Sequence, residues 1–203
     1  MHESGGPGWR ITMDTSGPML IALYLRDVAG LDGAGKPMLS QAAPKVRHAD
    51  HKHLTSDVGG FPALKTEWEA WWESLVKSYP NPAPELAPPS FKAFGNSPAL
   101  QRVLQAHFGS ALGWATDRID EYAHLEAARE ANGVTHVLNE MVEDRLLEVG
   151  RSSRDFELTI IELPLNEPRA WYLEPDTMIM SHRLLSEPDV FRSYVQPVVE
   201  MLA

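Results

Sequence analysis

The spacing of hydrophobic residues divides the chain into segments of different predicted structure. Four short segments have the alternating pattern or the apolar content of strands and are bounded by turn residues. They are residues 9–14, 156–163, 170–173 and 177–182. The first is the clearest, since Trp9, Ile11 and Met13 fall on one side and polar residues fall on the other. The sequence therefore predicts a small sheet.

Helical spacing occupies most of the chain between the first strand and the others. Apolar residues recur there at intervals of three and four, as they do on the buried face of a helix. These stretches are residues 62–79, 98–125 and 134–149, and a final helix starts at Pro188. Asn132-Gly133 separates the second stretch from the third, and so short a break favours an antiparallel helical hairpin. Gly109 and Gly113 are places where the longer helix can bend or split.

Residues 18–29 fit two structures. Five apolar residues follow a helical stripe that ends at Gly30, which favours a helix. Apolar residues on the opposite side, among them Met19, favour a buried strand that forms a hairpin with residues 9–14. The pattern leaves both interpretations open.

This order of strand, helices, strands and helix predicts an α+β protein, in which a small antiparallel sheet packs against helices. Five of the 16 prolines lie from Pro80 to Pro89. Because proline interrupts both helices and central strands, residues 80–90 are expected to form an extended connector. A chain of 203 residues is long enough for one substantial core. We therefore expect residues 1–203 to form a single α+β domain, with the connector between an N-terminal segment and the C-terminal half.

The composition excludes several chemistries. The chain has no cysteine, which rules out disulfides, thiolate metal sites and thiol nucleophiles. The formal net charge of −10 argues against binding to nucleic-acid phosphates, which requires a positive face. The apolar run Met19–Leu25 is too short to cross a bilayer and is badly placed for a signal peptide. We expect a soluble, cytoplasmic protein that binds neither nucleic acid nor membrane.

Residues 48–57 hold the densest set of potential metal ligands in the chain. His48, Asp50, His51 and His53 supply the imidazole and carboxylate groups that Zn²⁺ or Mn²⁺ prefers, and no other cofactor is implied. In an extended segment His51 and His53 would point to one side, whereas in a helix His48 and His51 would share a face. The alternative is a solvated loop with titrating histidines.

Two other motifs have ordinary structural interpretations. Gly30–Lys36 has the glycine and lysine spacing of a phosphate-binding loop, but Pro37 follows where such a loop has Ser or Thr, so a glycine-rich turn is favoured. Trp68, Trp71 and Trp72 fall within one apolar helical stripe, which favours packing in the core. The stripe is wide enough that its edge, with Trp72, is a candidate partner contact.

Negative charge is concentrated in the C-terminal half of the chain. Residues 117–148, most of the predicted hairpin, carry nine acidic and three basic residues. Glu140, Glu143 and Asp144 lie outside the apolar stripe, so they are expected to face water. Such a face is ordinarily just solvated, and its functional interpretation is a docking surface for a basic protein.

These observations favour a non-enzymatic binding or interaction protein with an acidic helical face. Its partner would be a basic protein or a second copy of the chain. The alternative, from another class, is a metal-dependent hydrolase in which residues 48–57 hold a metal-bound water as the nucleophile. No catalytic residue is assigned by the sequence.

Overall fold

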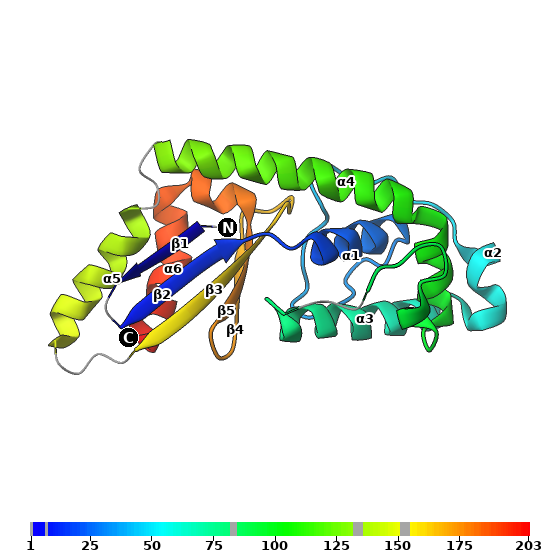
Figure 1. The fold of residues 1–203 in the computed structure, drawn as a ribbon, viewed down its shortest axis with the longest axis horizontal. Coiled ribbons are helices and arrows are strands. Elements are labelled where there is room, and N and C mark those ends of the chain that lie inside the picture. The colour runs from blue at the N-terminus through cyan, green and yellow to red at the C-terminus, as the bar shows by residue number, and fades with distance from the viewer. Residues whose placement is uncertain (1, 7, 82–84, 132–135, 151–154) are drawn as a thin grey trace. The chain divides into compact units, whose positions relative to one another are not determined.

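The computed structural model describes residues 2–6, 8–81, 85–131, 136–150 and 155–203 (Figure 1). In chain order its elements are β1 (His2–Gly6), β2 (Trp9–Asp14), α1 (Gly17–Val28), α2 (Lys52–Thr55), η1 (Ser56–Val58), α3 (Gly60–Ser78), η2 (Lys92–Phe94), α4 (Pro98–Ala131), α5 (His136–Val149), β3 (Phe156–Leu163), β4 (Ala170–Leu173), β5 (Thr177–Ser181), η4 (His182–Ser186) and α6 (Pro188–Leu202). Within these described ranges, no helix combines the length and the apolar character needed to span a membrane.

The chain forms two compact units. Residues 1–16 and 119–203 form one, here called the α/β unit, and residues 17–118 form the other, here called the helical unit. The boundaries fall after β2 and within α4, rather than at the proline-rich segment. The described residues of that segment, 80–81 and 85–90, belong to the helical unit.

The α/β unit contains a five-stranded mixed sheet in the order β1-β2-β3-β5-β4. This confirms the α+β class, but the expectation of an antiparallel sheet is wrong for its centre. β2 runs parallel to β3, with Ile11 opposite Leu158, and β3 runs parallel to β5. Only the edge strands β1 and β4 are antiparallel to their neighbours. The physical reason is the connection: all the residues from α1 to α5 lie between β2 and β3, which is ample for a parallel crossover.

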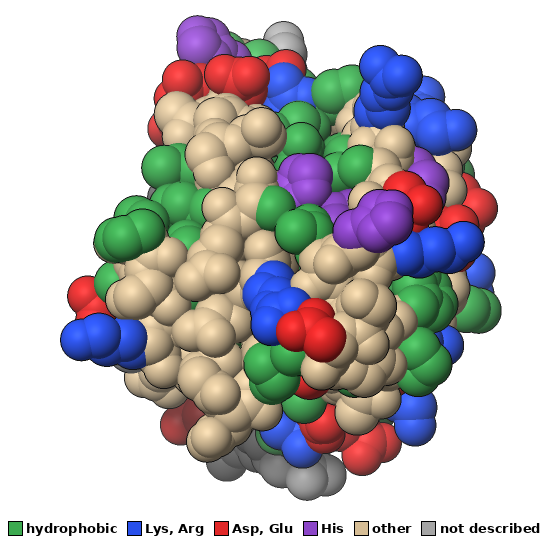
Figure 2. All heavy atoms as spheres, turned by 90° about the vertical axis from the view of Figure 1, so that its right-hand side faces the viewer, with side chains coloured by type: hydrophobic (Ala, Val, Ile, Leu, Met, Phe, Trp, Pro, Cys, Tyr) green, Lys and Arg blue, Asp and Glu red, His purple; other side chains and the backbone are tan. Residues whose placement is uncertain are grey.

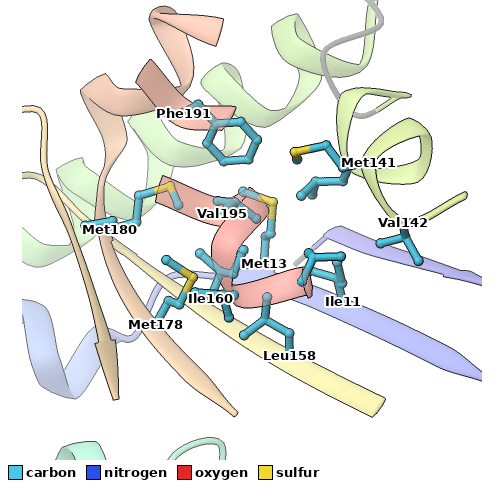
Figure 3. Packing of buried hydrophobic residues seen from close by; sticks show 14 of the residues in the cluster. Ile11, Met13, Met141, Val142, Leu158, Ile160, Met178, Met180, Phe191 and Val195 are labelled. Atoms are coloured by element: carbon cyan, nitrogen blue, oxygen red, sulfur yellow. The ribbon is translucent and has the colours of Figure 1, made fainter. Parts of the chain in front are cut away.

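The core of the α/β unit lies between one face of the sheet and the helices α5 and α6. Alternate residues of the strands point toward the apolar stripes of the two helices, as Figure 3 shows. The labelled members are Ile11, Met13, Leu158, Ile160, Met178 and Met180 from the sheet, Met141 and Val142 from α5, and Phe191 and Val195 from α6. Burying each large side chain of this kind contributes about 1.5–3 kcal/mol.

The predicted helical hairpin is not confirmed. α4 is one continuous helix of 34 residues, and it runs through Gly109 and Gly113 without a break. In the described part of the chain α5 packs against α6 and β1. The predicted break at Asn132-Gly133 and the predicted start of the next helix at Val134 lie outside the described residues.

Residues 18–28 lie in the helix α1, so the alternative of a strand paired with residues 9–14 is wrong. Nine of the 12 residues of α1 are buried, which explains why its sequence is apolar on more than one side. Two of the nine are charged: Arg26 donates from Nε to Oδ1 of Asp27 at 2.7 Å. Arg26 also donates to the carbonyls of Leu39 and Ser40, and Asp27 accepts from the amide of Ala42. This pair therefore holds the loop after α1 to the helix.

α3 provides most of the aromatic core of the helical unit. Trp68 and Trp72 stack with ring centroids 5.6 Å apart, and Trp68 donates from Nε1 to the carbonyl of Ala22. The glycine-rich turn lies over both rings. Gly35 has φ +89°, and a Cβ there would lie 3.0 Å from each ring, so any other residue would be strained and crowded against the rings. Trp72 is 1% exposed, and it offers no surface to a partner in this structure.

Candidate functional site: a histidine cleft

A cavity of about 440 Å³ opens in the helical unit between the end of α1, residues 48–56 and the first turn of α3. Its apolar wall includes Ala29, Phe61 and Leu64, and its polar wall includes His48 and His51. We call this cavity the histidine cleft. Figure 2, which faces the side that carries α2, shows histidine side chains gathered beside hydrophobic ones.

A second, more open cavity of about 680 Å³ adjoins the histidine cleft. The two share Gly30 and His48, and a Cβ on Gly30 would lie 2.7 Å from the imidazole of His48. Glycine at this position, with φ +66°, therefore lets His48 lie directly over the backbone. The basic side chains of Lys45 and Arg47 line the second cavity.

A pair of histidines supports the wall of the cleft. His51, which precedes α2 and is 6% exposed, places its Nε2 2.8 Å from Nε2 of His107 on α4. One ring must carry a proton on Nε2 while the other presents a lone pair, so the pair cannot be doubly protonated without losing this hydrogen bond. Burial lowers the pKa of both rings, and the nearby His107 lowers the pKa of His51 further. The pair is therefore held in a form with at least one neutral imidazole at neutral pH.

We expect this histidine pair to contribute stability that is lost as the pH drops below 6.5, the ordinary histidine value. Below that value the unfolded state binds protons that the folded state resists, so the contribution of the pair to the free energy of unfolding decreases as the pH falls. Each proton taken up on unfolding contributes a slope of about 1.4 kcal/mol per pH unit. In urea unfolding between pH 5.5 and 7.5, the free energy of unfolding of His107→Gln should rise relative to that of the wild type as the pH falls, because other groups that titrate in this range contribute alike to both proteins. His53→Gln, at an exposed position, is the control and should keep the wild-type slope; equal slopes in all three proteins would contradict the prediction.

The structure does not gather the four predicted metal ligands. Within the described ranges, no three His, Asp or Glu side chains are arranged to hold a metal ion. His53 is exposed on α2, and Asp50 accepts from the amide of Lys52 at 2.9 Å, which lowers the pKa of its carboxyl. His48 and His51 do line the same cleft. The metal site therefore remains a prediction, and the described residues form no group of ligands that supports it.

Asp57, at the end of the same segment, has a structural contact of its own. Its carboxylate makes a two-pronged ion pair with Arg102 of α4, in which Nη2 lies 2.8 Å from Oδ2. Arg102 also donates to the carbonyl of Leu54. The Arg102 guanidinium lowers the pKa of Asp57. This contact fastens α2 and η1 to α4, and so fixes one end of the segment that lines the cleft.

The cleft is also the place where α3 begins. Gly60 and Phe61, its first two residues, line the cavity, and Gly59 at the N-cap has no side chain with which to cap the helix. Residues 60–63 contain no Asp or Glu. The first backbone N–H groups of a helix have no partner within the helix and carry a partial positive charge. The first turn of α3 therefore adds positive potential to the cleft.

A second cluster of ionisable groups lies at the carboxyl end of β3 in the α/β unit. Glu162 is 0% exposed, and Arg129 of α4 donates to both of its carboxylate oxygens, at 2.9 and 2.7 Å. Arg129 donates in addition to the carbonyl of His182. Burial raises the pKa of Glu162 to about 7, against the opposing effect of Arg129, and burial raises the pKa of the nearby Tyr122 as well. These contacts join α4 to the sheet and to η4, which gives them a structural role.

The acidic residues expected to contact a partner lie at the surface of α5. Glu140, Glu143 and Asp144 are all exposed. Glu140 lies 3.9 Å from Arg192 of α6, a distance at which an exposed ion pair contributes little. Leu147, close to the three acids in sequence, is 82% exposed.

Sequence reasoning found the segment that lines the cleft but missed its supports. His107 and Arg102 both lie on α4, roughly 50 residues from the groups that they bind. Phe61 was assigned to no site, because its 50% exposure is visible only in the structure. In the sequence it lies three residues before Leu64, with the spacing of the buried stripe. No protein-family model, curated protein or solved structure matches this chain.

Proposed function

We propose that this protein binds a small molecule in the histidine cleft. The observation that carries the proposal is the cavity itself: about 440 Å³, with an apolar wall and a buried imidazole whose pKa is lowered. Sites for small molecules have this size, this mostly apolar lining and few polar groups, and shifted pKa values concentrate in them. The proposal keeps the class of a binding protein and assigns binding to residues 48–61 of the helical unit.

The experiment is a fragment screen by ligand-observed NMR on the wild type and on two tryptophan variants. Ser56 lines the cleft and is exposed, so Ser56→Trp should fill the cavity without disturbing the core. Ser74→Trp places the same side chain at an exposed position of α3 that does not line the cavity. We expect fragments that bind the wild type to bind Ser74→Trp with similar affinity and to lose at least tenfold in Ser56→Trp. Fragments that bind all three proteins alike, or no bound fragments at all, would overturn the proposal.

A second candidate function is the docking of a basic partner on α5. It is favoured by one observation, the exposure of Leu147 close to Glu143, Asp144 and Glu148, which are also exposed. Arg145 donates to Glu148 at 3.2 Å, so one base lies among these acids, but the acids outnumber it. An apolar anchor beside an excess of negative charge fits a partner that carries an apolar residue among basic ones.

This second candidate predicts association that weakens with salt. The test is pull-down of basic proteins, at low and at high ionic strength, by the wild type and by a Glu140→Lys/Glu143→Lys/Asp144→Lys variant. We expect the variant to lose the proteins that the wild type retains at low salt, because charge complementarity becomes repulsion. Retention by the variant equal to that of the wild type would rule out this surface.

A further inference from the structure

We propose that the ligand of the histidine cleft is an amphiphile with one anionic head group and an apolar body. This inference rests on the proposed function and names the class of molecule that the cleft takes. It is argued from three features: the apolar wall, the first turn of α3, and the distribution of charge around the two adjoining cavities.

The apolar wall provides the place for the body of the ligand. Ala29, Thr55 and Leu64 line the cavity and are buried. Phe61 lines the same cavity but is half exposed. A ligand seated against Phe61 would remove apolar surface from water, which is favourable by about 25 cal/mol for each Å².

The first turn of α3 provides the place for the head group. Gly60 and Phe61 line the cavity, and no side chain caps the helix there. Backbone N–H groups at such a helix start bind carboxylate, phosphate or sulfate oxygens. His51 and Lys52 line the same cavity, so the anion would meet a buried imidazole and a basic residue there. Asp50 lines it as well, and its carboxylate accepts from the amide of Lys52.

The charge around the cleft differs from that of the whole chain. The chain carries a net charge of −10, yet Lys45 and Arg47 line the cavity that adjoins the cleft. Asp27, which lines that same cavity, is already neutralised by its buried ion pair with Arg26. Asp32 lines the second cavity and Asp50 lines the cleft, so the two cavities present Lys45, Arg47 and Lys52 against these two carboxylates. This is a small positive excess in an otherwise acidic protein, and it favours an anion.

Octanoate and octanamide are the probes that test the inference, because they differ in charge and little in apolar body. Each would be titrated into isotope-labelled full-length protein at pH 7 and followed by ¹H–¹⁵N NMR. We expect octanoate to bind at least tenfold more tightly than octanamide. The amide resonances of Gly60 and Phe61 should be among those that shift most with octanoate.

Two variants at one position separate the charge of the site from its shape. Phe61→Glu places a carboxylate in the first turn of α3, and Phe61→Gln places a neutral side chain of nearly the same size there. Position 61 is half exposed, so both variants should fold. We expect octanoate to bind Phe61→Glu about two- to fivefold more weakly than Phe61→Gln, because the introduced carboxylate would take up the favourable interaction of an anion with the helix start. Octanamide should bind the two variants equally.

The outcomes distinguish this inference from the proposed function. If octanamide binds as tightly as octanoate, or if the two variants bind octanoate equally, the anionic class is wrong and small-molecule binding stands. If neither probe binds while fragments still bind in a way that Ser56→Trp abolishes, the amphiphile is wrong and small-molecule binding again stands. If no molecule binds in either experiment, both proposals fail.

Discussion

Replacing Arg129 with methionine is expected to lower the free energy of unfolding by about 3–5 kcal/mol at pH 8. Methionine matches the length of the arginine stem but cannot donate a hydrogen bond. The variant leaves the carboxylate of Glu162, which is 0% exposed, without the guanidinium that contacts both of its oxygens. It also leaves the carbonyl of His182 without that donor. Leaving a buried charge without its partner lowers the free energy of unfolding by far more than the intact ion pair had added to it.

The loss in Arg129→Met should be smaller at pH 5.5 than at pH 8. Burial raises the pKa of Glu162 from 4.5 to about 7 in the folded wild type, and Arg129 opposes that rise. Because the pKa of Glu162 is higher in the folded protein than in the unfolded chain, its protonated form stabilises the folded state at low pH. This stabilisation is lost as the pH rises through the folded pKa. Removing Arg129 raises the folded pKa further, so the variant should lose stability with rising pH more steeply than the wild type.

The control for this prediction is the double variant Arg129→Met/Glu162→Gln. It removes the charge that Arg129→Met leaves unpaired, so we expect it to be more stable at pH 8 than Arg129→Met alone. Its stability should also depend less on pH than that of either the wild type or the single variant. Chemical unfolding of the four proteins of this cycle at pH 5.5 and pH 8 provides the measurements. A loss below 1 kcal/mol in Arg129→Met, or the same loss at both pH values, would show that the pair does not hold α4 to the sheet.

Helices and strands that are marked by the spacing of their own hydrophobic residues could be predicted from the sequence to within a few residues. Residues 9–14 and 156–163 form β2 and β3 with the predicted bounds, and the predicted helix over residues 62–79 is α3, Gly60–Ser78. One side of each element is buried, so the hydrophobic residues on that side recur with the period of a strand or of a helix. The final helix, which starts at Pro188, is confirmed for the same reason.

Elements that depend on distant parts of the chain could not be predicted. β1 consists of small and polar residues and is specified by its pairing with β2, so no apolar alternation marks it. α1 is buried over most of its surface, and the helical period is hidden when both sides are apolar. The parallel pairing of β3 with β5 places β5 between β3 and β4. A sequence that shows three consecutive strands cannot distinguish this arrangement from a simple meander.

In the candidate site, too, the residues that are close together in the sequence could be predicted, and their partners elsewhere in the chain could not. Residues 48–57 could be singled out because their histidines and aspartates are close together in the chain. What those groups do depends on α4: His51 binds His107, and Asp57 binds Arg102. Neither partner lies in a motif, so the sequence offered a metal site or a solvated loop for this segment, and not a buried pair of histidines. The contacts to α4 turn the segment into the wall of a cleft.

Replacing Trp68 with alanine is expected to lower the free energy of unfolding by about 3–5 kcal/mol, the range measured for large aromatic residues in cores. Trp68 is fully buried, stacks on Trp72 at 5.6 Å and donates to the carbonyl of Ala22. Alanine would remove the stack, leave that carbonyl without its donor and open a cavity beneath the glycine-rich turn. Because Gly35 lies against both tryptophan rings, the turn would lose one side of its support.

Trp171→Ala is the matched control, because it makes the same substitution on the edge strand β4, where Trp171 is only half-buried and lies against Arg169. We expect it to cost about 1 kcal/mol or less, since little core volume is lost and an exposed cation–π contact is weak. Urea unfolding of both variants beside the wild type measures the difference. Equal losses in the two variants would show that the stripe of tryptophans on α3 is not the core of the helical unit. A large loss in Trp68→Ala alone would confirm that the stripe, read from the sequence as buried, holds the glycine-rich turn and α1 together.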